Sequence, residues 1–303
     1  MIALEAYEAG MAAGLADAYN RVVRGVPHCH PVSEEAFAEA VAATVGEGGD
    51  RGRLHSEAAF VAKEDGAIWG FIHLAVERPK EPEQPEQGCI PFLWYERGRR
   101  QAGQALLDAA HEYFAQRALP SATAFFQDYR YPFYHLDHAY LSDRLDHVMA
   151  LLCLNGYRKY CGEVYLDWPA FEPPEPAPTE VAHEIEVRHE PSGARLADVA
   201  VIARQDGERV GICCCNSCGH FSPADAAQDW FLVDWLHVDE KWRGRGLGKH
   251  VLQRALAECH AIGYRNAAIS TNWENWRAFV FYSNIGFRVF DWTYGFAREL
   301  AKG

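Results

Sequence analysis

The chain has 303 residues, a formal net charge of −13 and nine cysteines. This length suits two domains, each with a core of its own. An acidic chain repels nucleic acids and anionic membranes, and we find no secretory leader and no long apolar stretch. We therefore expect a cytoplasmic protein, monomeric or weakly homodimeric, with reduced thiols, no nucleic-acid or membrane partner, and a small-molecule substrate.

The same pattern of elements occurs twice along the chain. Phe60–Val76 and Ala200–Cys215 each read as a strand, an Asp-Gly turn and a second strand that contains a glycine. Asp-Gly between two such runs is a strong hairpin signal, because both residues tolerate a positive φ. Each hairpin is followed by a strand, an Arg/Gly junction, a long helix, a strand, a shorter helix and a final strand. The sequence therefore predicts an α/β fold with two tandem units, each built on a mixed sheet.

The first copy opens with two helical patterns, Leu4 to Arg24 and Ser33 to Thr44, which the second copy lacks. Five prolines between Pro169 and Pro178 predict an extended linker between the copies. We therefore divide the chain into a first domain at 1–168, a Pro-rich linker at 169–180 and a second domain at 181–303.

The junction between strand and helix in the second copy reads "KWRGRGLGK" and ends at Lys249. Glycines at 244, 246 and 248 leave room for close approach to the backbone. Successive N–H groups at the start of a helix form a nest for phosphate, and the neighbouring Arg and Lys side chains add positive charge. The alternative is a plain turn with solvated arginines. The spacing fits neither the Walker A pattern nor the GxGxxG dinucleotide fingerprint.

Two motifs in the second copy resemble those of the GNAT N-acetyltransferase superfamily. "LHVDEKWRGRGLGKHVLQRAL" is similar to its acetyl-CoA-binding motif, although Lys241 stands where Gln or Arg is usual. "NWENWRAFVFYSNIGF" is similar to a later motif, with matches at Asn275, Ala278, Tyr282, Gly286 and Phe287. The match covers Glu184 to Leu300, and the first copy matches in outline only. The layout resembles mycothiol synthase-like tandem GNAT proteins, with two GNAT-like acyl-CoA N-acyltransferase domains.

The resemblance implies acetyl-CoA as co-substrate and acetyl transfer to a small-molecule primary amine. It implies that backbone groups of Leu236 and Val238 pair with the pantetheine arm and that Asn275 lies near it. Tyr282 takes the role of the acid that protonates the leaving thiolate, although the alternative for this tyrosine is a core aromatic. The resemblance also implies that the diphosphate is bound by the backbone amides of Arg243, Gly244, Arg245, Gly246, Leu247, Gly248 and Lys249.

The reaction also needs a neutral amine and a polarised carbonyl. The N–H of Val238 is the candidate for polarising the thioester carbonyl. Asp234 is our candidate base, because a carboxylate in an apolar strand is costly unless it is paired or used. A structural partner explains Asp234 equally well, and His237 and Glu240 are the other nearby candidates.

The first copy has lost these features. Its junction, "YERGRRQAGQALL", lacks the alternating glycines, and Leu152 occupies the position that matches Tyr282. We interpret this copy as a degenerate GNAT-like domain. Arg97, Arg99 and Arg100 either bind a CoA-like anion weakly or form a solvated turn. A non-catalytic CoA-binding or regulatory protein is therefore the alternative function for the whole chain.

A cluster of thiols follows the second hairpin, in "GICCCNSCGHF" from Gly211 to Phe221. Cys215, Cys218 and His220 could supply three zinc ligands, which would indicate a metal or redox protein. Alternate residues of a strand point to opposite faces, however, and no second CxxC supplies a fourth ligand. We therefore favour small buried thiols and predict no metal site.

Overall fold

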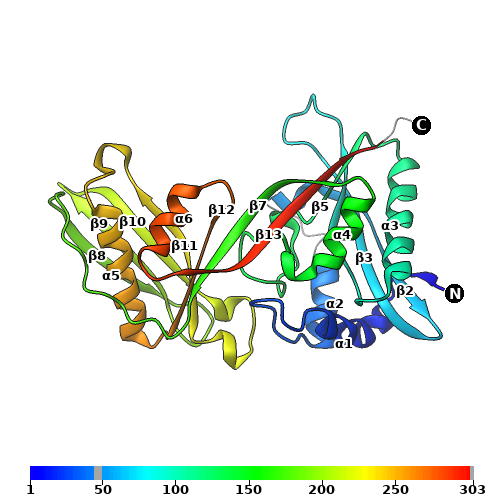
Figure 1. The fold of residues 1–303 in the computed structure, drawn as a ribbon, viewed down its shortest axis with the longest axis horizontal. Helices are drawn as coiled ribbons and strands as arrows, with labels where there is room; N and C mark the ends of the chain where they lie inside the picture. The colour runs from blue at the N-terminus through cyan, green and yellow to red at the C-terminus, as the bar shows by residue number, and fades with distance from the viewer. Residues whose placement is uncertain (44–49, 301–303) are drawn as a thin grey trace. The chain divides into compact units, whose positions relative to one another are not determined.

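The computed structural model describes residues 1–43 and 50–300, so Thr44, where the second predicted helix ends, lies outside the described residues. The chain forms two compact units. Unit 1 comprises residues 1–163 and 291–303, and unit 2 comprises residues 164–290 (Figure 1). Within the described ranges, no helix is long and apolar enough to cross a membrane.

Unit 1 contains a mixed sheet in the order β1-β2-β3-β4-β5-β13-β7, with the short β6 paired to β13. The pairs β4·β5 are parallel and the pairs β2·β3 and β3·β4 are antiparallel. Its elements are β1 (Ala3–Ala6), α1 (Ala12–Val22), α2 (Glu34–Ala43), β2 (Leu54–Glu64), β3 (Ala67–Glu77), β4 (Gln87–Tyr95), α3 (Arg100–Ala115), β5 (Ser121–Ala124), β6 (Leu141–Ser142), α4 (Asp146–Leu154) and β7 (Arg158–Trp168).

Unit 2 repeats the arrangement in the order β7-β12-β11-β10-β9-β8, with β11 and β12 parallel. Helix α5 packs on one face of β9, β10 and β11. Its elements are β8 (Glu184–Glu190), β9 (Asp198–Gln205), β10 (Glu208–Ser217), β11 (Trp230–Val238), α5 (Leu247–Ile262), β12 (Asn266–Asn272), α6 (Trp276–Ser283) and the start of β13 (Arg288–Glu299). The mixed-sheet α/β fold expected from the sequence is therefore present in both units.

The two Asp-Gly turns have the backbone that the sequence predicts. Asp65 and Gly66 have φ values of 51° and 80°, and Asp206 and Gly207 have φ values of 51° and 81°. Positive φ at both central positions characterises the mirror-image turn whose twist matches that of the flanking strands. The hairpins β2–β3 and β9–β10 therefore close in corresponding ways.

Two strands run from one unit into the other. Strand β7 lies in unit 1 up to Glu163 and contributes residues 164–168 to unit 2, whereas β13 belongs to unit 1 from Asp291 onward. In unit 1, residues 296–299 of β13 pair with β5. These ranges differ from the predicted division at 168 and 181, because the closing strand of each copy is divided between the units.

The opening segments differ between the units, as the sequence indicates. Unit 1 has α1 and α2 before its hairpin, whereas unit 2 passes from β8 to β9 through residues 191–197 without a helix. The first predicted helix begins too early, because Ala3–Ala6 form the strand β1 and pair with β2. Glu5 also forms an ion pair with Lys63, at 2.6 Å, across these two strands.

The Pro-rich segment at 169–180 is packed on unit 2. Phe171 is buried and contacts the ring of Phe231, with centroids 5.5 Å apart. Further along, the N–H of Ala177 donates to Gln253 Oε1 at 2.8 Å, and the ring of His250 hydrogen-bonds to Ala177 O at 2.8 Å. We call residues 171–180 the strap, because they lie along α5 up to the Arg/Gly junction. The predicted linker is thus part of the second unit's structure.

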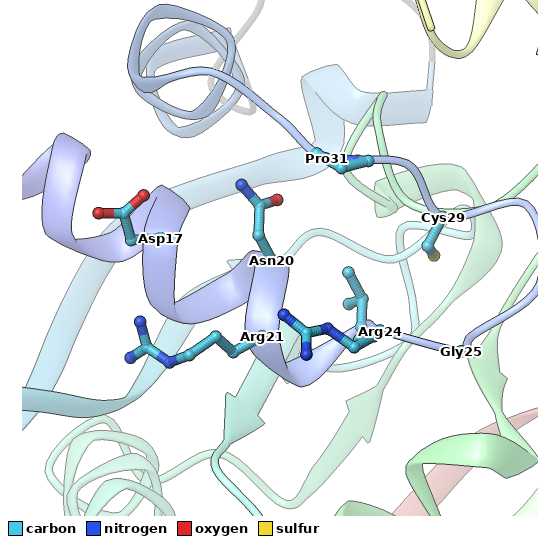
Figure 2. A pocket seen from close by; sticks show the side chains of 8 residues that line it. Asp17, Asn20, Arg21, Arg24, Gly25, Cys29 and Pro31 are labelled. Atoms are coloured by element: carbon cyan, nitrogen blue, oxygen red, sulfur yellow. The ribbon is translucent and has the colours of Figure 1, made fainter. Parts of the chain in front are cut away.

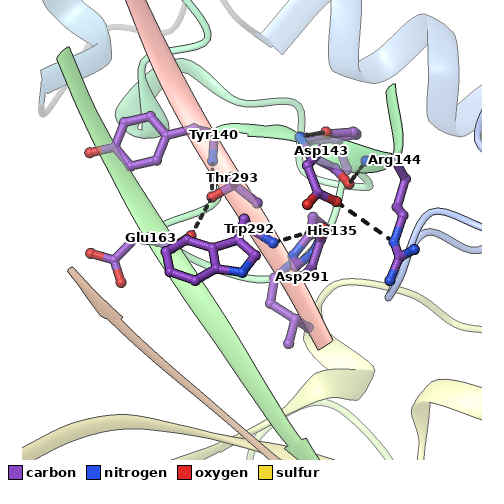
Figure 3. Close-up of polar contacts among 11 residues, drawn as sticks. His135, Tyr140, Asp143, Arg144, Glu163, Asp291, Trp292 and Thr293 are labelled. Carbon is purple, nitrogen blue, oxygen red and sulfur yellow. Dashed lines mark hydrogen bonds and ion pairs between the residues drawn. The ribbon is translucent and has the colours of Figure 1, made fainter. Parts of the chain in front are cut away.

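A buried polar network holds β13 in unit 1 (Figure 3). The backbone N–H of Leu136 donates to His135 Nδ1, which leaves the ring proton on Nε2, and Nε2 faces Asp291 Oδ2 at 3.2 Å. The carboxyl group of Asp143 lies near that of Asp291, and Arg144 Nε faces Asp143 Oδ1 at 3.7 Å. Burial raises the pKa of Asp291, and burial together with Asp291 raises the pKa of Asp143 to about 6. Partial burial and the neighbouring carboxyl group therefore favour the protonated form of Asp143.

Candidate coenzyme cleft in unit 2

The central parallel strands of unit 2 separate halfway along their length. Strands β11 and β12 pair only from Trp230 to Val233, opposite residues 266–269. The register between β10 and β11 shifts between Cys214 and Cys215, so that Asp234 is the extra residue of a β-bulge. A bulge bends its strand and increases its twist. Beyond Val233, β11 therefore diverges from β12 and leaves an open edge.

The backbone of the end of β11 faces this gap. The N–H of Asp239 donates to Val210 O on the β10 side, at 3.1 Å. Successive N–H groups of a strand point to opposite edges, so the N–H of Val238 points away from β10. The carbonyl of Val238 points the same way and accepts from Arg243 Nε at 2.8 Å. Leu236, two residues earlier, presents its backbone in the same direction.

The Arg/Gly junction forms a turn of left-handed residues before α5. Gly244 and Gly246 have φ values of 80° and 86°, and Gly246 is the N-cap of the helix. In the part of the chain that the structure describes, the N–H groups of residues 244–249 donate to no protein oxygen. Unpaired amides at a helix start, next to the positive end of its macrodipole, attract anions. The predicted phosphate nest is therefore available in this geometry.

The strap determines how the nest is oriented. The carbonyl of Arg245 accepts from the hydroxyl of Thr179 at 2.9 Å and from the N–H of Glu180 at 3.1 Å. The C=O and the following N–H of a trans peptide point in opposite directions, so the N–H of Gly246 points away from the strap. A Cβ on Gly246 would lie 3.1 Å from Pro178 O. Sequence reasoning missed this role, because the proline spacing suggested a free linker.

The splayed strand, the junction and the start of α6 enclose one cleft of about 470 Å³. Nine of the residues predicted from the sequence line it, together with four that were not predicted as ligands. The predicted ones are Leu236, Val238, Arg243, Gly244, Gly246, Gly248, Lys249, Asn275 and Tyr282, and the others are His237, Arg277, Ala278 and Phe281. The helical spacing of Arg277, Ala278 and Phe281 relative to Asn275 and Tyr282 could have revealed three of these four.

Three predicted residues do not line the cleft. Leu247 is buried under the sheet and anchors the first turn of α5. The side chain of Arg245 lies over the ring of Trp242, with its guanidinium carbon 5.3 Å from the centroid. Asp234, in the bulge, is half-buried beside Cys214 and contributes to raising the pKa of that thiol to about 11, although burial is the main cause.

Asn275 and Tyr282 are placed by α6. The side chain of Asn275 caps this helix by accepting from the N–H of Ala278 at 3.2 Å. Tyr282, two turns later, is buried against the rings of Phe281 and Phe287, with centroids 5.3 Å and 6.3 Å away. Residues at this spacing share one face of a helix, which explains why both line the cleft.

His237 is the titratable group of β11 that lines the cleft. It pairs with Ile212 across the sheet, on the face opposite to that of Leu236. Its ring is stacked with that of exposed Trp235, at 6.3 Å and 16°. Its Nε2 lies 3.4 Å from Asp239 Oδ1, so that a carboxylate orients the imidazole. This His–Asp pair lies beside the open edge of β11.

Unit 1 splays its strands at the corresponding place but fills the gap. Strands β4 and β5 pair only over residues 88–90, and Tyr95 faces Gly70 as Val238 faces Gly211. The Tyr95 hydroxyl donates to the carbonyl of His147 at 2.7 Å, and the ring of His147 hydrogen-bonds back to Tyr95 O at 2.8 Å. Tyr95 and His147 therefore form a plug between β4 and α4.

The junction of unit 1 is also shorter. Residues 96–98 connect β4 to the N-cap of α3, whereas residues 239–245 connect β11 to the N-cap of α5. The N–H groups of Ala102 and Gly103 donate to Arg99 O, at 2.9 Å and 3.3 Å. Leu152, in the position of Tyr282, is buried. Unit 1 therefore lacks both the wide turn of unit 2 and a counterpart of the Tyr282 hydroxyl group.

The thiols after the second hairpin lie in and after β10. Cys213, Cys215 and Cys218 are buried, and the Sγ atoms of Cys213 and Cys215 are 4.0 Å apart. His220 instead faces Asp198 at 3.2 Å. Among the described residues, no group of three or more His, Cys, Asp or Glu side chains has the geometry to hold a metal ion.

One protein-family model matches part of the chain. Residues 163–287 match the model of the acetyltransferase (GNAT) family. No curated protein sequence matches the chain.

Solved structures share the fold along the whole chain. A tandem GNAT protein from the clavulanic acid biosynthesis pathway is 15% identical, covers 100% of both chains and has a TM-score of 0.67. A GCN5-related N-acetyltransferase from Sphaerobacter thermophilus is 16% identical, covers 100% of this chain and 96% of its own, and has a TM-score of 0.60. A glucosamine N-acetyltransferase region of a fungal multi-domain β-N-acetylglucosaminidase is 13% identical, with a TM-score of 0.63, and covers 98% of this chain and 38% of its own.

Proposed function

We propose that this chain, which has the tandem GNAT fold, is an acetyl-CoA-dependent N-acetyltransferase that acts on a small-molecule primary amine, with the chemistry in unit 2. The observation that carries the proposal is the convergence of three features on one cleft of about 470 Å³. These features are the unpaired amides of the junction, the open edge of β11 and the buried hydroxyl-bearing ring of Tyr282.

The nest and the splayed strand suit the two ends of the coenzyme. The N–H groups of residues 244–249, with Arg243 and Lys249 beside them, offer donors and positive charge to a diphosphate. The outward backbone groups of Leu236 and Val238 can continue as a strand with the amides of pantetheine. The thioester then lies at the splay, between β11 and α6.

Each chemical step has a group of unit 2 near it. The amine nitrogen attacks the thioester carbonyl carbon, and the N–H of Val238 stabilises the negative charge that develops on oxygen. The C–S bond then breaks, and Tyr282 gives its proton to the departing sulfur. The amine loses one proton to a base, so that the products are an amide and a free thiol. Holding both substrates in one cleft supplies much of the acceleration.

We assign the base to His237 in preference to Asp234. His237 lines the cleft and has Asp239 behind it at 3.4 Å, whereas Asp234 does not line the cleft. A carboxylate behind an imidazole fixes its orientation and stabilises the imidazolium that forms. His237→Gln should lower kcat/KM and remove the acid limb of its pH profile, while Asp234→Asn should preserve that limb. The opposite result would return the role to Asp234.

The function is tested with purified full-length protein, acetyl-CoA and a panel of primary amines, by following release of free thiol. Tyr282→Phe should lower kcat by about 100-fold, as expected for loss of a general acid, and leave the Kd for acetyl-CoA near that of the wild type. The exposed Tyr160→Phe serves as the matched control and should change neither quantity. Tight acetyl-CoA binding without turnover on any amine would instead favour the non-catalytic CoA-binding alternative.

A further inference from the structure

Unit 1 contains an arginine-lined pocket that the coenzyme cleft of unit 2 does not explain. The pocket has a volume of about 420 Å³ and lies between the end of α1, the turn after β4 and the start of α4. Arg21, Arg24, Arg97 and Arg144 line it, and Glu96 is the one carboxylate among the residues that line it. Four guanidinium groups around one cavity are unusual in a chain with a net charge of −13.

Three of the four arginines each face one carboxylate, and Arg144 does so through Nε, which lies 3.7 Å from Asp143 Oδ1. Arg21 directs Nε and Nη2 to the same oxygen of Glu96, at 2.7 Å and 2.6 Å. Arg97 directs Nη2 to Asp146 Oδ1 at 2.6 Å. Arg24 is exposed and makes no hydrogen bond or ion pair within the described ranges. Since each guanidinium carries five N–H donors, the pocket retains a surplus of donors and of positive charge.

His147 lies where this pocket meets the plug of unit 1. Its Nε2 hydrogen-bonds to Tyr95 O, which leaves Nδ1 as the remaining polar atom of the ring. That Nδ1 is buried without a hydrogen bond and lies 3.7 Å from Asp146 Oδ1. Burial lowers the pKa of His147, with a further contribution from Arg97. His147 is therefore held by Tyr95 at the edge of the pocket, and the donors available to an anion come from the arginines.

A second cavity of about 470 Å³ adjoins the first and shares Arg21, Arg24 and Gly25 with it. Figure 2 shows both arginines at the end of α1 and Asn20 on the side of the helix toward Pro31. Asn20 fixes the segment around Val32 to α1, because its amide group donates to Val32 O at 3.0 Å and accepts from Val32 N at 2.9 Å. Arg21 and Arg24 thus stand between two cavities, with room for an anionic group and for the body that carries it.

We propose that the arginine-lined pocket of unit 1 binds the phosphate group of a small phosphomonoester. A phosphate dianion offers several strong acceptors and therefore suits a cavity lined by four arginines better than a single carboxylate does. The coenzyme diphosphate does not fit this site, since the N–H groups of Ala102 and Gly103 are already bonded and Tyr95 fills the strand gap. The degenerate unit is then a ligand-binding domain.

The test is a calorimetric titration of the full-length chain with inorganic phosphate and with glycerol 3-phosphate, after saturation with CoA to occupy the nest of unit 2. We expect one remaining site, and Arg24→Gln should weaken it by at least about tenfold, the equivalent of about 1.4 kcal/mol. Arg158→Gln is the matched control, because Arg158 is exposed in the same unit and lines neither cavity. Acetyl transfer by the Arg24 variant should be unchanged.

Three results would overturn the proposal. Absence of phosphate binding at millimolar concentration would do so, as would equal weakening by Arg24→Gln and Arg158→Gln, which indicates diffuse surface charge. Loss of all phosphate binding after CoA saturation would show that the nest of unit 2 is the phosphate site. If the chain failed to bind CoA, the proposed function would fall, whereas phosphate binding that depends on Arg24 would still stand.

Discussion

Units 1 and 2 splay their central strands at corresponding positions and yet end with different interiors. In unit 2 the splay opens onto Val238 and a seven-residue turn, 239–245, whose following amides are unpaired. In unit 1 the three residues 96–98 make the turn, and Tyr95 occupies the gap. The comparison shows that the shared fold supplies a gap between the central strands of each unit. One side chain and four residues of loop distinguish the filled gap of unit 1 from the open gap of unit 2.

Transferring the plug should give the largest effect. In Val238→Tyr, a phenol occupies the gap between β11 and α6, as Tyr95 does in unit 1. We expect acetyl-CoA to bind more than about 100-fold more weakly by calorimetry, because the ring overlaps the space for pantetheine. Val238→Ile, which keeps the gap, is the control. Unaltered affinity in the tyrosine variant would contradict our placement of the coenzyme.

The reciprocal change sharpens the same comparison. Tyr95→Val should open the gap of unit 1 without creating a second coenzyme site, because the short junction has no free nest. A stoichiometry of two coenzymes per chain in this variant would show that the plug alone silences unit 1.

A smaller loss is expected from Gly246→Ala. Gly246 has a φ of 86°, and an added Cβ would lie 3.1 Å from Pro178 O. The strained backbone costs about 1–2 kcal/mol and turns the nest amides away, so the Kd for acetyl-CoA should rise by about tenfold. Gly207→Ala has a similar φ of 81° at a hairpin tip with no atom in contact, and should leave the Kd unchanged.

The partly buried Asp143 should make the stability of unit 1 depend on pH. The folded state keeps a proton on Asp143 up to about pH 6, while the unfolded chain releases it near pH 4. The folded state thus binds more protons in this window, and the free energy of unfolding should fall as pH rises from about 4 to 6. In thermal melts, the stability of Asp143→Asn should depend less on pH than that of the wild type. The control Asp206→Asn, at an exposed position, should keep the pH dependence of the wild type. Identical slopes would remove Asp143 from this role.

The smallest effect tests the strap. Thr179→Val removes one of the two hydrogen bonds to Arg245 O and keeps the volume of the side chain. A lost hydrogen bond of about 1 kcal/mol should raise the KM for acetyl-CoA by a few fold with little change in kcat. Thr123→Val, in the core of unit 1, is the comparison for general destabilisation. A change in kcat without a change in KM would mean that the strap does not affect acetyl-CoA binding through the nest.

Local patterns predicted the features that depend on a few neighbouring residues. The Asp-Gly hairpins, with their positive φ values, and the long helix α5 follow from turn chemistry and helix periodicity. Most of the predicted coenzyme residues line one cleft, because the two motifs lie on elements that flank the splay.

Features set by tertiary contacts were not visible in the sequence. The strap has the composition of a linker, and only its hydrogen bonds to α5 and Arg245 show that it is structural. The division of β13 between the units could not be predicted from periodicity. An alternating pattern predicts that a segment is a strand, but it does not show which strands pair with it. The pocket around Arg24 required three distant segments to converge.

The exchanged strand has a consequence for synthesis. Residues 296–299 lie beside β5 in the first unit, although the whole second unit precedes them in the chain. The emerging polypeptide cannot complete the sheet of unit 1 until residues 296–299 have been synthesised. Removal of about ten C-terminal residues should therefore damage the half of the molecule that was translated first.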